Sequence, residues 1–438
     1  MPHLSIRNLG PIRTCDIEIK KFMVLTGQQS AGKSTIAKAI FFFKTIKETI
    51  ISCKMESLVN NNIQSVSLAT RVIKALRKKF LQIFGTSWTM DNMRMEYHYT
   101  DSKTISVYLR DSRIESEPNF VFVELCQELQ EFLFELDESN NLLEKSCLEK
   151  KLDVFFEDDC VAVYVPAGRS MLTLLSHQIN YIFATMDESQ RRMLDYCTWN
   201  YMERILKLKP IFVRGMEGLL YDKKNTTTDF IDMEKMKELI KKINFIMQGE
   251  YKYVDGEERL VLPNNEGYIK INFSSSGQQE ALWILNLIFY YALENKNVYY
   301  IIEEPESHLY PNAQRIITEI IAFAIAGSNQ GLLTTHSPYV LGAINNLIYG
   351  KVLFDRNPSE TKRVLEENKL LVRQLVDASH VSAHFVSNGT VADCFDYDMK
   401  LINNRYIDGA SDDINNLMEQ WMDLEEKLNE QMPKYVRS

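Results

Sequence analysis

Runs of apolar residues that end in polar turns recur along the chain and predict buried strands. Phe22–Leu25 is one such run, and 298–302 and 331–335 are two more in the last third of the sequence. Helical patterns over 279–294 and 312–326 separate these later runs. Strands that alternate with helices in this way are typical of a mostly parallel sheet with helices on its faces. The fold class that we expect is therefore α/β.

Further signals lie outside this alternating region. Residues 3–26 favour two or three short strands, and residues 36–84 favour a largely helical segment with a basic amphipathic helix at 71–80. A solvated face over an apolar stripe explains that helix better than nucleic-acid binding does. The remaining predictions are a β-hairpin near 93–110, strands near 161–165 and 268–273, and a hairpin over 251–262 with a turn at Asp255-Gly256.

Residues 115–159 differ from the rest in charge, with fourteen Asp or Glu against three Lys. Leu125, Leu129, Phe132 and Leu136 recur at helical spacing. We therefore expect an acidic helical insertion, which is too short for a long coiled-coil arm. A second polar helical stretch is expected over about 184–248.

Composition places the chain among ordinary globular proteins. It has 438 residues, 45% hydrophobic and 25% charged, without an apolar run long enough for a membrane span. The N-terminal residues lack a signal-peptide pattern, and the seven scattered cysteines form no Cys-x-x-Cys pair. We therefore expect a cytoplasmic protein with reduced thiols, no structural zinc and no membrane contact. A net charge of −9 means that nucleic-acid contact needs a local basic patch.

A glycine-rich stretch between the first apolar run and a helical segment is the strongest chemical signal. A strand, a glycine loop that ends in Gly-Lys-Ser and a helix form the phosphate-binding P-loop, whose backbone N–H groups surround phosphate oxygens. Lys33 is expected to reach the β- and γ-phosphates, and the Ser34 hydroxyl to bind Mg²⁺. The stretch reads Gly27, Gln28, Gln29, Ser30, Ala31, Gly32, Lys33, Ser34 and Thr35.

Two acids end the apolar run 298–302. A nucleotide site needs one carboxylate for the Mg²⁺ shell and, where it hydrolyses ATP, a second that polarises the attacking water. Glu303 stands at the position of the metal carboxylate, and Glu304 is the candidate general base. Five apolar residues directly before the pair, in a chain that has a P-loop, favour this Walker B interpretation over two surface acids.

A serine-glycine pair precedes the helix that lies upstream of these acids. At a helix N-terminus the Ser276 hydroxyl and the Gly277 N–H are free to bind a γ-phosphate. Together with Gln279, they are similar to the signature motif of ABC-type ATPases, with Gln278 in place of the usual second glycine. All three are therefore candidate nucleotide-binding residues.

The order of the motifs resembles the ABC/SMC/OLD-like branch of P-loop ATPases. Pro305–Pro311 resembles the D-loop of that class, and His336 resembles its switch histidine, which contacts the γ-phosphate. The chain also resembles the compact OLD-like ATPase subunits of two-gene anti-phage systems, PtuA of Septu and retron systems and AriA of PARIS. The strings Tyr164–Ser170, Ser275–Glu280 and Val381–Phe385 carry this second resemblance.

The resemblance implies a domain division. We expect an ABC-type P-loop ATPase core over 1–45 and 250–345, with a mixed, mostly parallel sheet. Residues 46–249 are expected to be helical insertions that carry the hairpin near 93–110 and the strand near 161–165. A small C-terminal α/β extension is expected over 346–438.

The resemblance also implies ATP and Mg²⁺ as ligands; ATP is preferred to GTP because no Asn-Lys-x-Asp guanine motif is visible. Lys33, Glu304 and His336 would be catalytic in a homodimer or higher oligomer, where the P-loop of one chain faces the Ser276-Gly277 helix of another. The implied role is defence, with the ATPase restraining a separate effector such as a nuclease and nucleic acid as a trigger to be tested. A DNA-repair or chromosome-maintenance ATPase of the SMC type and the soluble ATPase of a transporter remain alternatives.

Two parts of the family pattern are missing. No Q-loop glutamine can be placed, since Gln178 lies within a helix-like segment. OLD nucleases also carry a C-terminal metal-binding domain, but only about a hundred residues follow His336, and only forty follow Asp396–Asp398. We therefore expect no nuclease activity from this chain. His380 and His384 are expected at a strand edge rather than on a metal.

Overall fold

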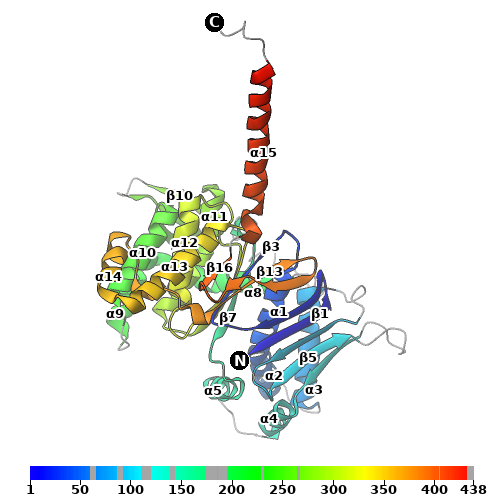
Figure 1. The fold of residues 1–438 in the computed structure, drawn as a ribbon. Coiled ribbons are helices and arrows are strands. Elements are labelled where there is room, and N and C mark those ends of the chain that lie inside the picture. Colours follow the sequence, from blue (N-terminus) through cyan, green and yellow to red (C-terminus); the bar gives the residue numbers. More distant parts are fainter. Residues whose placement is uncertain are drawn as a thin grey trace.

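The computed structural model describes residues 1–59, 66–85, 92–109, 120–138, 144–173, 185, 195–227, 231–263, 267–403 and 405–431. Its central element is a six-stranded sheet in the order β14-β13-β3-β12-β11-β7 (Figure 1). In chain order, the strands are β3 (Phe22–Gly27), β7 (Val161–Val165), β11 (Val298–Glu303), β12 (Gln330–Thr335), β13 (Val381–Ser387) and β14 (Thr390–Asp393).

The central sheet takes strands from all three segments into which the sequence was divided. β3, β11 and β12 come from the expected core and pair in parallel, as the alternating pattern predicted. β7, from within 46–249, pairs in parallel with β11. β13, from within 346–438, pairs in parallel with β3. The sheet of the ATPase core is therefore extended on both sides by segments that the sequence assigned elsewhere.

The parallel register brings the predicted motifs to one edge of this sheet. Thr335 of β12 lies opposite Thr26 of β3, and Thr334 lies opposite Glu303 of β11. Gly27 begins the P-loop, Glu303 begins the pair of acids, and His336 follows directly after β12. Because the carboxyl ends of parallel strands share one edge, the three motifs converge there.

Different helices cover the two faces of the sheet. Side chains alternate along each strand, so Val24 packs with α11, α12 and α13, whereas Leu25 packs with α1, α2 and α3. The helices predicted near 279–294 and 312–326 are confirmed as α11 and α12. The bounds are α1 (Lys33–Lys44), α2 (Ile46–Val59), α3 (Leu68–Phe84), α11 (Ser276–Leu293), α12 (Pro311–Ile325) and α13 (Pro338–Arg356).

A five-stranded antiparallel sheet, in the order β2-β1-β4-β5-β6, shares a hydrophobic core with α1, α2 and α3. The hairpin predicted near 93–110 is confirmed as β4 and β5. The helical stripe predicted to start at Leu125 is wrong at that end, because alternate residues of β6 are buried and Leu125 pairs with Ile105. The bounds are β1 (His3–Leu9), β2 (Ile12–Glu18), β4 (Arg94–His98), β5 (Thr104–Leu109) and β6 (Val121–Leu125).

The rest of the acidic segment forms two packed helices, α4 (Gln127–Glu138) and α5 (Lys145–Phe156). Leu129, Leu133 and Leu136 of α4 are buried, and α5 likewise turns apolar side chains inward. The described part of the acidic segment therefore contributes to a core, and most of the acids of α4 lie on its outer face. The exposed acids of α4 are Glu128, Glu131, Glu135 and Glu138.

Further helices and a small sheet surround α11. The hairpin predicted at Asp255-Gly256 is confirmed as β8 and β9, and the strand predicted at 268–273 is shorter and ends in a 3₁₀ turn. The bounds are α8 (Tyr196–Leu208), η2 (Lys209–Arg214), α9 (Gly215–Thr226), α10 (Met233–Met247), β8 (Glu250–Val254), β9 (Glu257–Val261), β10 (Tyr268–Lys270) and η4 (Ile271–Phe273).

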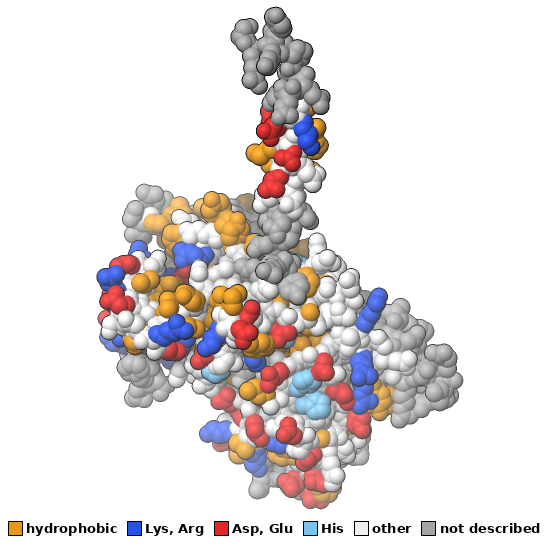
Figure 2. All heavy atoms as spheres, in the orientation of Figure 1, with side chains coloured by type: hydrophobic (Ala, Val, Ile, Leu, Met, Phe, Trp, Pro, Cys, Tyr) orange, Lys and Arg blue, Asp and Glu red, His pale blue; other side chains and the backbone are white. Residues whose placement is uncertain are grey.

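The C-terminal segment ends in α15 (Arg405–Gln431), which projects from the rest of the chain (Figure 1). Every side chain described on it, over 414–428, is exposed, and Figure 2 shows hydrophobic side chains among the acids in this described part. The other bounds are α14 (Pro358–Glu367), η5 (Val372–Gln374), η6 (Ala378–His380), β15 (Phe395–Asp396) and β16 (Leu401–Ile402). Among the described helices, none has the length and apolar character needed to cross a membrane.

His384 corrects one expectation. It was expected at a strand edge, but β13 has β3 on one side and β14 on the other, so His384 is buried within the sheet. Its pKa is lowered because burial disfavours the charged imidazole. Gln178 lies outside the described residues.

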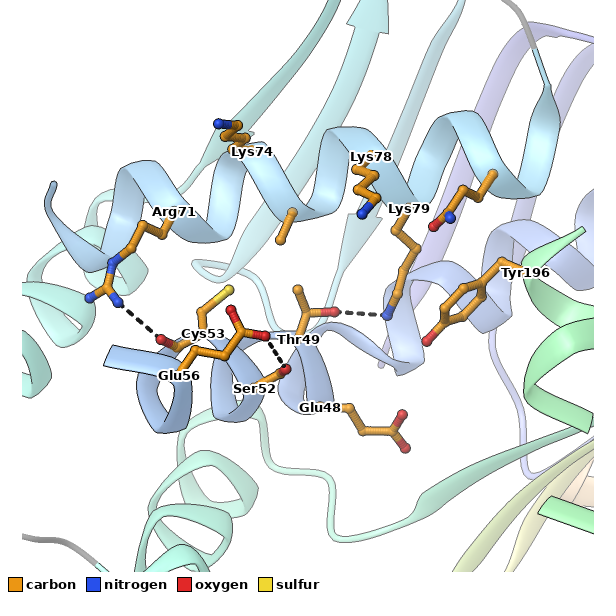
Figure 3. A pocket seen from close by; sticks show the side chains of 12 residues that line it. Glu48, Thr49, Ser52, Cys53, Glu56, Arg71, Lys74, Lys78, Lys79 and Tyr196 are labelled. Carbon is orange, nitrogen blue, oxygen red and sulfur yellow. Dashed lines mark hydrogen bonds between the residues drawn. The ribbon is translucent and has the colours of Figure 1, made fainter. Parts of the chain in front are cut away.

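A pocket of about 510 Å³ lies between α2 and α3, and Figure 3 shows Lys79 reaching across it from α3. The Lys79 ammonium donates to Thr45 Oγ1 at 3.0 Å and Thr49 Oγ1 at 2.7 Å, and it lies 4.8 Å from the Tyr196 ring centre. Burial lowers the pKa of Lys79 to about 8. The basic helix predicted at 71–80 thus packs an apolar stripe and one lysine inward, and Lys74 and Lys78 are exposed.

Lys79 should make stability depend on pH. Below pH 8 the lysine is charged in both the folded and the unfolded chain, so folding carries the full cost of burying a charge. Between pH 8 and the unfolded pKa of 10.5 only the unfolded chain keeps the proton, so stability rises with pH, by roughly 3 kcal/mol in total. We expect Lys79→Met to abolish this rise in urea unfolding measured from pH 7 to 10. Lys74→Met, on the same helix, should keep it, and an equal slope in both variants would contradict the assignment.

Candidate nucleotide site

The loop between β3 and α1 has the backbone shape that the glycine-rich sequence predicts. Gly27 and Gly32 have positive φ angles of 137° and 110°. A Cβ at Gly27 would lie 2.1 Å from the Val386 carbonyl oxygen, and one at Gly32 would lie 2.3 Å from Ile12 Cδ1. Only glycine fits these two positions, because both the backbone angle and the space exclude a side chain.

Lys33 begins α1 and folds back over this loop. Its side chain is buried, and its ammonium donates to the carbonyl oxygens of Gly27 at 3.1 Å and Gln28 at 2.8 Å. Burial lowers its pKa, while Glu304, Glu306 and Glu303 oppose that change. The ammonium therefore lies at the loop that would hold phosphates, next to three acids. Ser34, the next residue, is exposed on the first turn of α1.

Glu303 fits a metal ligand. Its side chain is 4% exposed, and Oε2 accepts a hydrogen bond from the Ala167 N–H at 3.2 Å. Oε1 is buried without a hydrogen-bond partner, which is costly for a carboxylate oxygen. Such an oxygen suits a hard cation, as does a serine hydroxyl at the start of the P-loop helix. Glu303 and Ser34 are accordingly the residues that would hold Mg²⁺.

Glu304 has the properties of a general base. Its carboxylate lies 3.5 Å from His336 Nε2 and accepts from Ser307 Oγ at 3.4 Å. The hydrogen bond from His336 lowers its pKa most, and the charges of His336 and Lys33 lower it further against the effect of burial. Glu304 is therefore ionised near neutral pH, as a base must be. The pair predicted from the sequence, Glu304 and His336, thus lies together.

Glu306 has a role that the sequence did not predict. Its Oε1 accepts from Thr335 Oγ1 at 2.6 Å and from the His336 N–H at 2.8 Å, so it fixes the backbone that carries the histidine. Burial raises its pKa. The sequence offered one clue to this role: Glu306 lies in the string that resembles a D-loop, two residues after the candidate base Glu304.

The helix N-terminus predicted as a signature motif is present. Ser275 caps α11, with Gln278 completing a capping box, and Ser276 is exposed in the first turn. A Cβ at Gly277 would lie 2.7 Å from the His308 carbonyl oxygen, so the glycine allows the D-loop-like turn to approach the helix. Gln279, the third residue predicted to bind nucleotide, is buried.

The amide of Gln279 contacts the backbone of its own chain. Its Nε2 donates to the carbonyl oxygens of Ile271 at 3.2 Å and Ser274 at 3.0 Å. These contacts hold the turn that leads into α11. Gln279 therefore shapes the loop next to Ser276.

The P-loop and the signature helix lie on opposite faces of the central sheet. α1 packs in the core that contains Leu25, and α11 packs in the core that contains Val24. Figure 1 shows the two helices apart, with α1 beside the N-terminal sheet and α11 among α10, α12 and α13. Lys33, Glu303, Glu304 and His336 come together in one chain, whereas Ser276 begins α11, which packs in the other core.

The turn after β7 also meets the acids. β7 runs beside β11, with Val165 opposite Ile302, so the Pro-Ala-Gly-Arg turn that follows β7 lies next to Glu303. This string carries the resemblance to the ATPase subunits of two-gene systems, but its sequence predicted no chemical role for it. Among the described residues, the one group with metal-ligand spacing is Asp158, Asp159 and Cys160, where Asp158 is paired with Lys44 at 2.8 Å. Asp396, which begins the Asp-x-Asp string considered for a metal site, accepts hydrogen bonds from the N–H groups of Asp398 and Met399 in the turn that follows it.

Three solved structures that match most of this chain share 10–12% identity with it. One is an Smc head bound to the C-winged helix domain of ScpA, with a TM-score of 0.42, covering 89% of this chain and 96% of that one. The SMC head domain from Thermotoga maritima has a TM-score of 0.34 and covers 89% and 97%. An Smc head domain with an extended coiled coil, bound to the C-terminal domain of ScpA from Pyrococcus furiosus, has a TM-score of 0.34 and covers 90% and 96%.

A family model described as AAA ATPase domain matches residues 1–341, and no curated protein matches the chain. The match spans the P-loop, the signature helix, both Walker B acids and His336, which are the motifs that the central sheet arranges. The chain therefore belongs to the AAA ATPase domain family.

Proposed function

We propose that this ATPase hydrolyses ATP at sites shared between two copies of the chain. The observation that carries the proposal is the position of α1 and α11 on opposite faces of the sheet. Lys33 and Glu304 lie at one end of a would-be γ-phosphate site, while Ser276 of the same chain begins a helix that packs on the other face of the sheet. A second copy that presents its α11 N-terminus would close the site and complete the contacts to the γ-phosphate.

Each residue has a chemical role in this site. Lys33 binds the β- and γ-phosphates, and the backbone of residues 27–32 surrounds the phosphate oxygens. Glu304 takes the proton of the attacking water, and His336 orients Glu304 through the 3.5 Å contact. Ser34 and Glu303 would hold Mg²⁺, which would supply positive charge against the phosphates.

We further propose that the ATPase acts through a separate effector, such as a nuclease, in anti-phage defence. Support comes from the resemblance carried by Tyr164–Ser170, Ser275–Glu280 and Val381–Phe385 to the ATPase subunits of two-gene defence systems. A surface for a basic partner is the outward face of α4, whose exposed acids recur at helical spacing. ATP-driven closure of a dimer would change how such a partner is held.

The SMC-type alternative differs in the segment between α1 and α11. Long paired arms would emerge there in an SMC protein. Here the described part of that segment forms β4, β5, β6, β7 and helices with buried apolar faces. This packing favours the compact effector-controlling ATPase over a chromosome-maintenance one. A permease gene next to this one would favour the transporter alternative instead.

Lys33→Ala tests whether the P-loop is used. Loss of the ammonium removes the counter-charge to the phosphates, so we expect ATP turnover to fall by roughly 10²–10³-fold with the fold intact. A fluorescent ATP analogue measures binding, and phosphate release measures turnover. Lys38→Ala, whose side chain instead pairs with Asp195 on α8, is the matched control on the same helix. Equal turnover by the wild type and Lys33→Ala would remove the P-loop from the mechanism.

The effector proposal needs a test with the chain alone. We expect no cleavage of plasmid, single-stranded DNA or tRNA by the purified ATPase with ATP and Mg²⁺ or Mn²⁺. The protein encoded next to it should co-purify with the wild type, and less with a variant in which Glu128, Glu131 and Glu135 are replaced by Lys. Cleavage by the chain alone that follows its ATPase activity through several columns would overturn the proposal.

A further inference from the structure

Arg169, which lies in the turn after β7, is fully buried, and all three nitrogens of its guanidinium group donate hydrogen bonds. Its Nε donates to the Glu280 carbonyl oxygen at 3.0 Å, and the guanidinium lies 3.2 Å from the Glu280 carboxylate. Its NH1 donates to the carbonyl oxygens of Pro166 and Glu303, both at 2.6 Å. Its NH2 donates to the Glu304 carbonyl oxygen at 2.9 Å. One side chain thus contacts the signature helix and both Walker B acids.

Side chains of both segments, α11 and the turn after β7, contribute to the contact with the signature helix. Glu280 lies one turn after Ser276 on α11, and its carboxylate accepts from the backbone N–H groups of Arg169 at 3.1 Å and Ser170 at 2.9 Å. Thr173 adds a bond from its hydroxyl to the Gln279 carbonyl oxygen at 3.2 Å. The start of α11 and the helical segment 169–173 are therefore held together, and a shift of one moves the other.

The contact with Walker B falls at an unusual backbone position. Glu304 has a positive φ of 41°, which a residue with a side chain adopts only when its surroundings hold it there. On one side the Glu304 N–H donates to the Thr334 carbonyl oxygen at 2.9 Å. On the other side Arg169 binds the carbonyl oxygens of Glu303 and Glu304. The Ser307 N–H also donates to the Glu304 carbonyl oxygen, at 3.1 Å. Arg169 is therefore one of several supports of the backbone that carries the base, and the one that comes from the turn after β7.

We propose that Arg169 is a positioning residue that couples the signature helix to the general base of its own chain. The inference rests on the proposed two-chain site. In such a dimer, α11 contacts the γ-phosphate bound by the partner, while Glu304 serves the γ-phosphate bound by its own P-loop. Arg169 and Glu280 connect these two ends within one chain, so phosphate binding at one site adjusts the base at the other.

Arg169→Lys tests the coupling with a conservative change. Lysine can keep the ion pair with Glu280, but its single ammonium cannot replace the planar fork that binds Glu303 and Glu304 at the same time. We expect kcat at saturating ATP to fall by roughly 10–100-fold, because a small displacement of a catalytic group has effects of that size. The KM for ATP should change little, since Lys33 and the P-loop are untouched.

Arg204→Lys is the matched control. Arg204 on α8 also joins β7 to α11, because it donates to the Ala162 carbonyl oxygen at 3.1 Å and to Tyr291. It has no contact with Walker B among the described residues. A purely structural role for Arg169 predicts equal loss of thermal stability and of kcat in both variants. Coupling predicts a kcat loss confined to Arg169→Lys, with Glu280→Gln showing the same loss as a second variant.

Mixed dimers test separately the two groups that Arg169 is proposed to couple, which are the general base and the signature helix. Mixed with Lys33→Ala chains, an Arg169→Lys chain supplies the base of the one intact site. Mixed with Ser276→Arg chains, it supplies the signature helix instead. We expect both mixtures to be slower than the reference mixture of Lys33→Ala with Ser276→Arg, after the activity of Arg169→Lys alone is subtracted. A loss in only one mixture, or in neither, would overturn the coupling.

Failure of this inference differs from failure of the proposed function. If the wild type hydrolyses ATP and Arg169→Lys has the same kcat, the coupling is wrong and the ATPase stands. If the reference mixture recovers no activity although mixed dimers form, the two-chain site is wrong, and the coupling between sites is wrong with it. If the wild type does not hydrolyse ATP, the catalytic proposal itself is wrong.

Discussion

Glu304→Gln is expected to lower kcat by roughly 10²–10⁴-fold while ATP still binds, because the substitution keeps the shape of the side chain and removes the base. The structure gives this expectation a basis, since the carboxylate is oriented by His336 and Ser307 and its pKa is lowered mainly by the histidine. With hydrolysis blocked, the ATP-bound dimer should persist. Phosphate release in single-turnover reactions and light scattering with ATP measure the two effects.

Glu306→Gln provides the comparison. Glu306 is buried, its pKa is raised, and it accepts hydrogen bonds that a glutamine oxygen can also accept. We therefore expect a smaller loss than in Glu304→Gln, and no trapped dimer. The pH profile gives a second readout: because the Glu304 pKa is lowered, the acid limb of kcat should lie below the usual glutamate range. An acid limb of kcat near neutral pH, or equal losses of kcat in Glu304→Gln and Glu306→Gln, would argue against Glu304 as the base.

The sequence predicted the parts of the site that depend on short motifs. A P-loop needs a strand, glycines with special backbone angles and a helix in direct succession, so Gly27, Gly32 and Lys33 could be recognised locally. Glu303 and Glu304 follow a wholly apolar run, which predicts a buried strand. Motifs of this kind carry their structural context within a few residues.

The parts that the sequence did not predict depend on pairing between distant segments. β7 looked like an isolated strand within helical insertions, and only its pairing with β11 places Arg169 beside the acids. β13 was assigned to an extension, yet its Val386 approaches Gly27 so closely that no Cβ fits there. The pattern of polar and apolar residues within one strand does not determine which other strand pairs with it. The contacts of Gln279 with the backbone of the preceding turn could not be read from its motif for a related reason, since they depend on how that turn folds.

The acidic segment illustrates the same limit. From sequence alone, residues 115–159 were expected to form an acidic helical insertion. In the structure, Val121 and Val123 lie in the antiparallel sheet, and Leu129 and Leu133 fill its core. A deletion would remove buried apolar side chains and destabilise the whole N-terminal half. Charge reversal on the outer face of α4 tests partner binding without that damage.

A mixture of two inactive variants should recover activity if two chains share each site. Ser276→Arg places bulk and charge at the N-terminus of α11, where the exposed serine would meet the partner's γ-phosphate. Alone it should bind ATP without hydrolysing it. Mixed in equal amounts with Lys33→Ala, it should regain up to about a quarter of the wild-type rate, because half of randomly paired dimers hold one intact site out of two. Coupling to the inactive second site would lower the rate below that value.

The controls for this mixture fix its meaning. Lys33→Ala mixed with the double variant Lys33→Ala/Ser276→Arg has no intact pair and should stay inactive. Differently tagged chains show whether mixed dimers form. If they form and the rate stays at the level of the inactive control, each site must be completed within one chain. In that case α11 would have to reach its own P-loop across the sheet that now separates its core from the core of α1. Recovery near one quarter instead supports a site in which Glu304 and Lys33 come from one chain and Ser276 from the other.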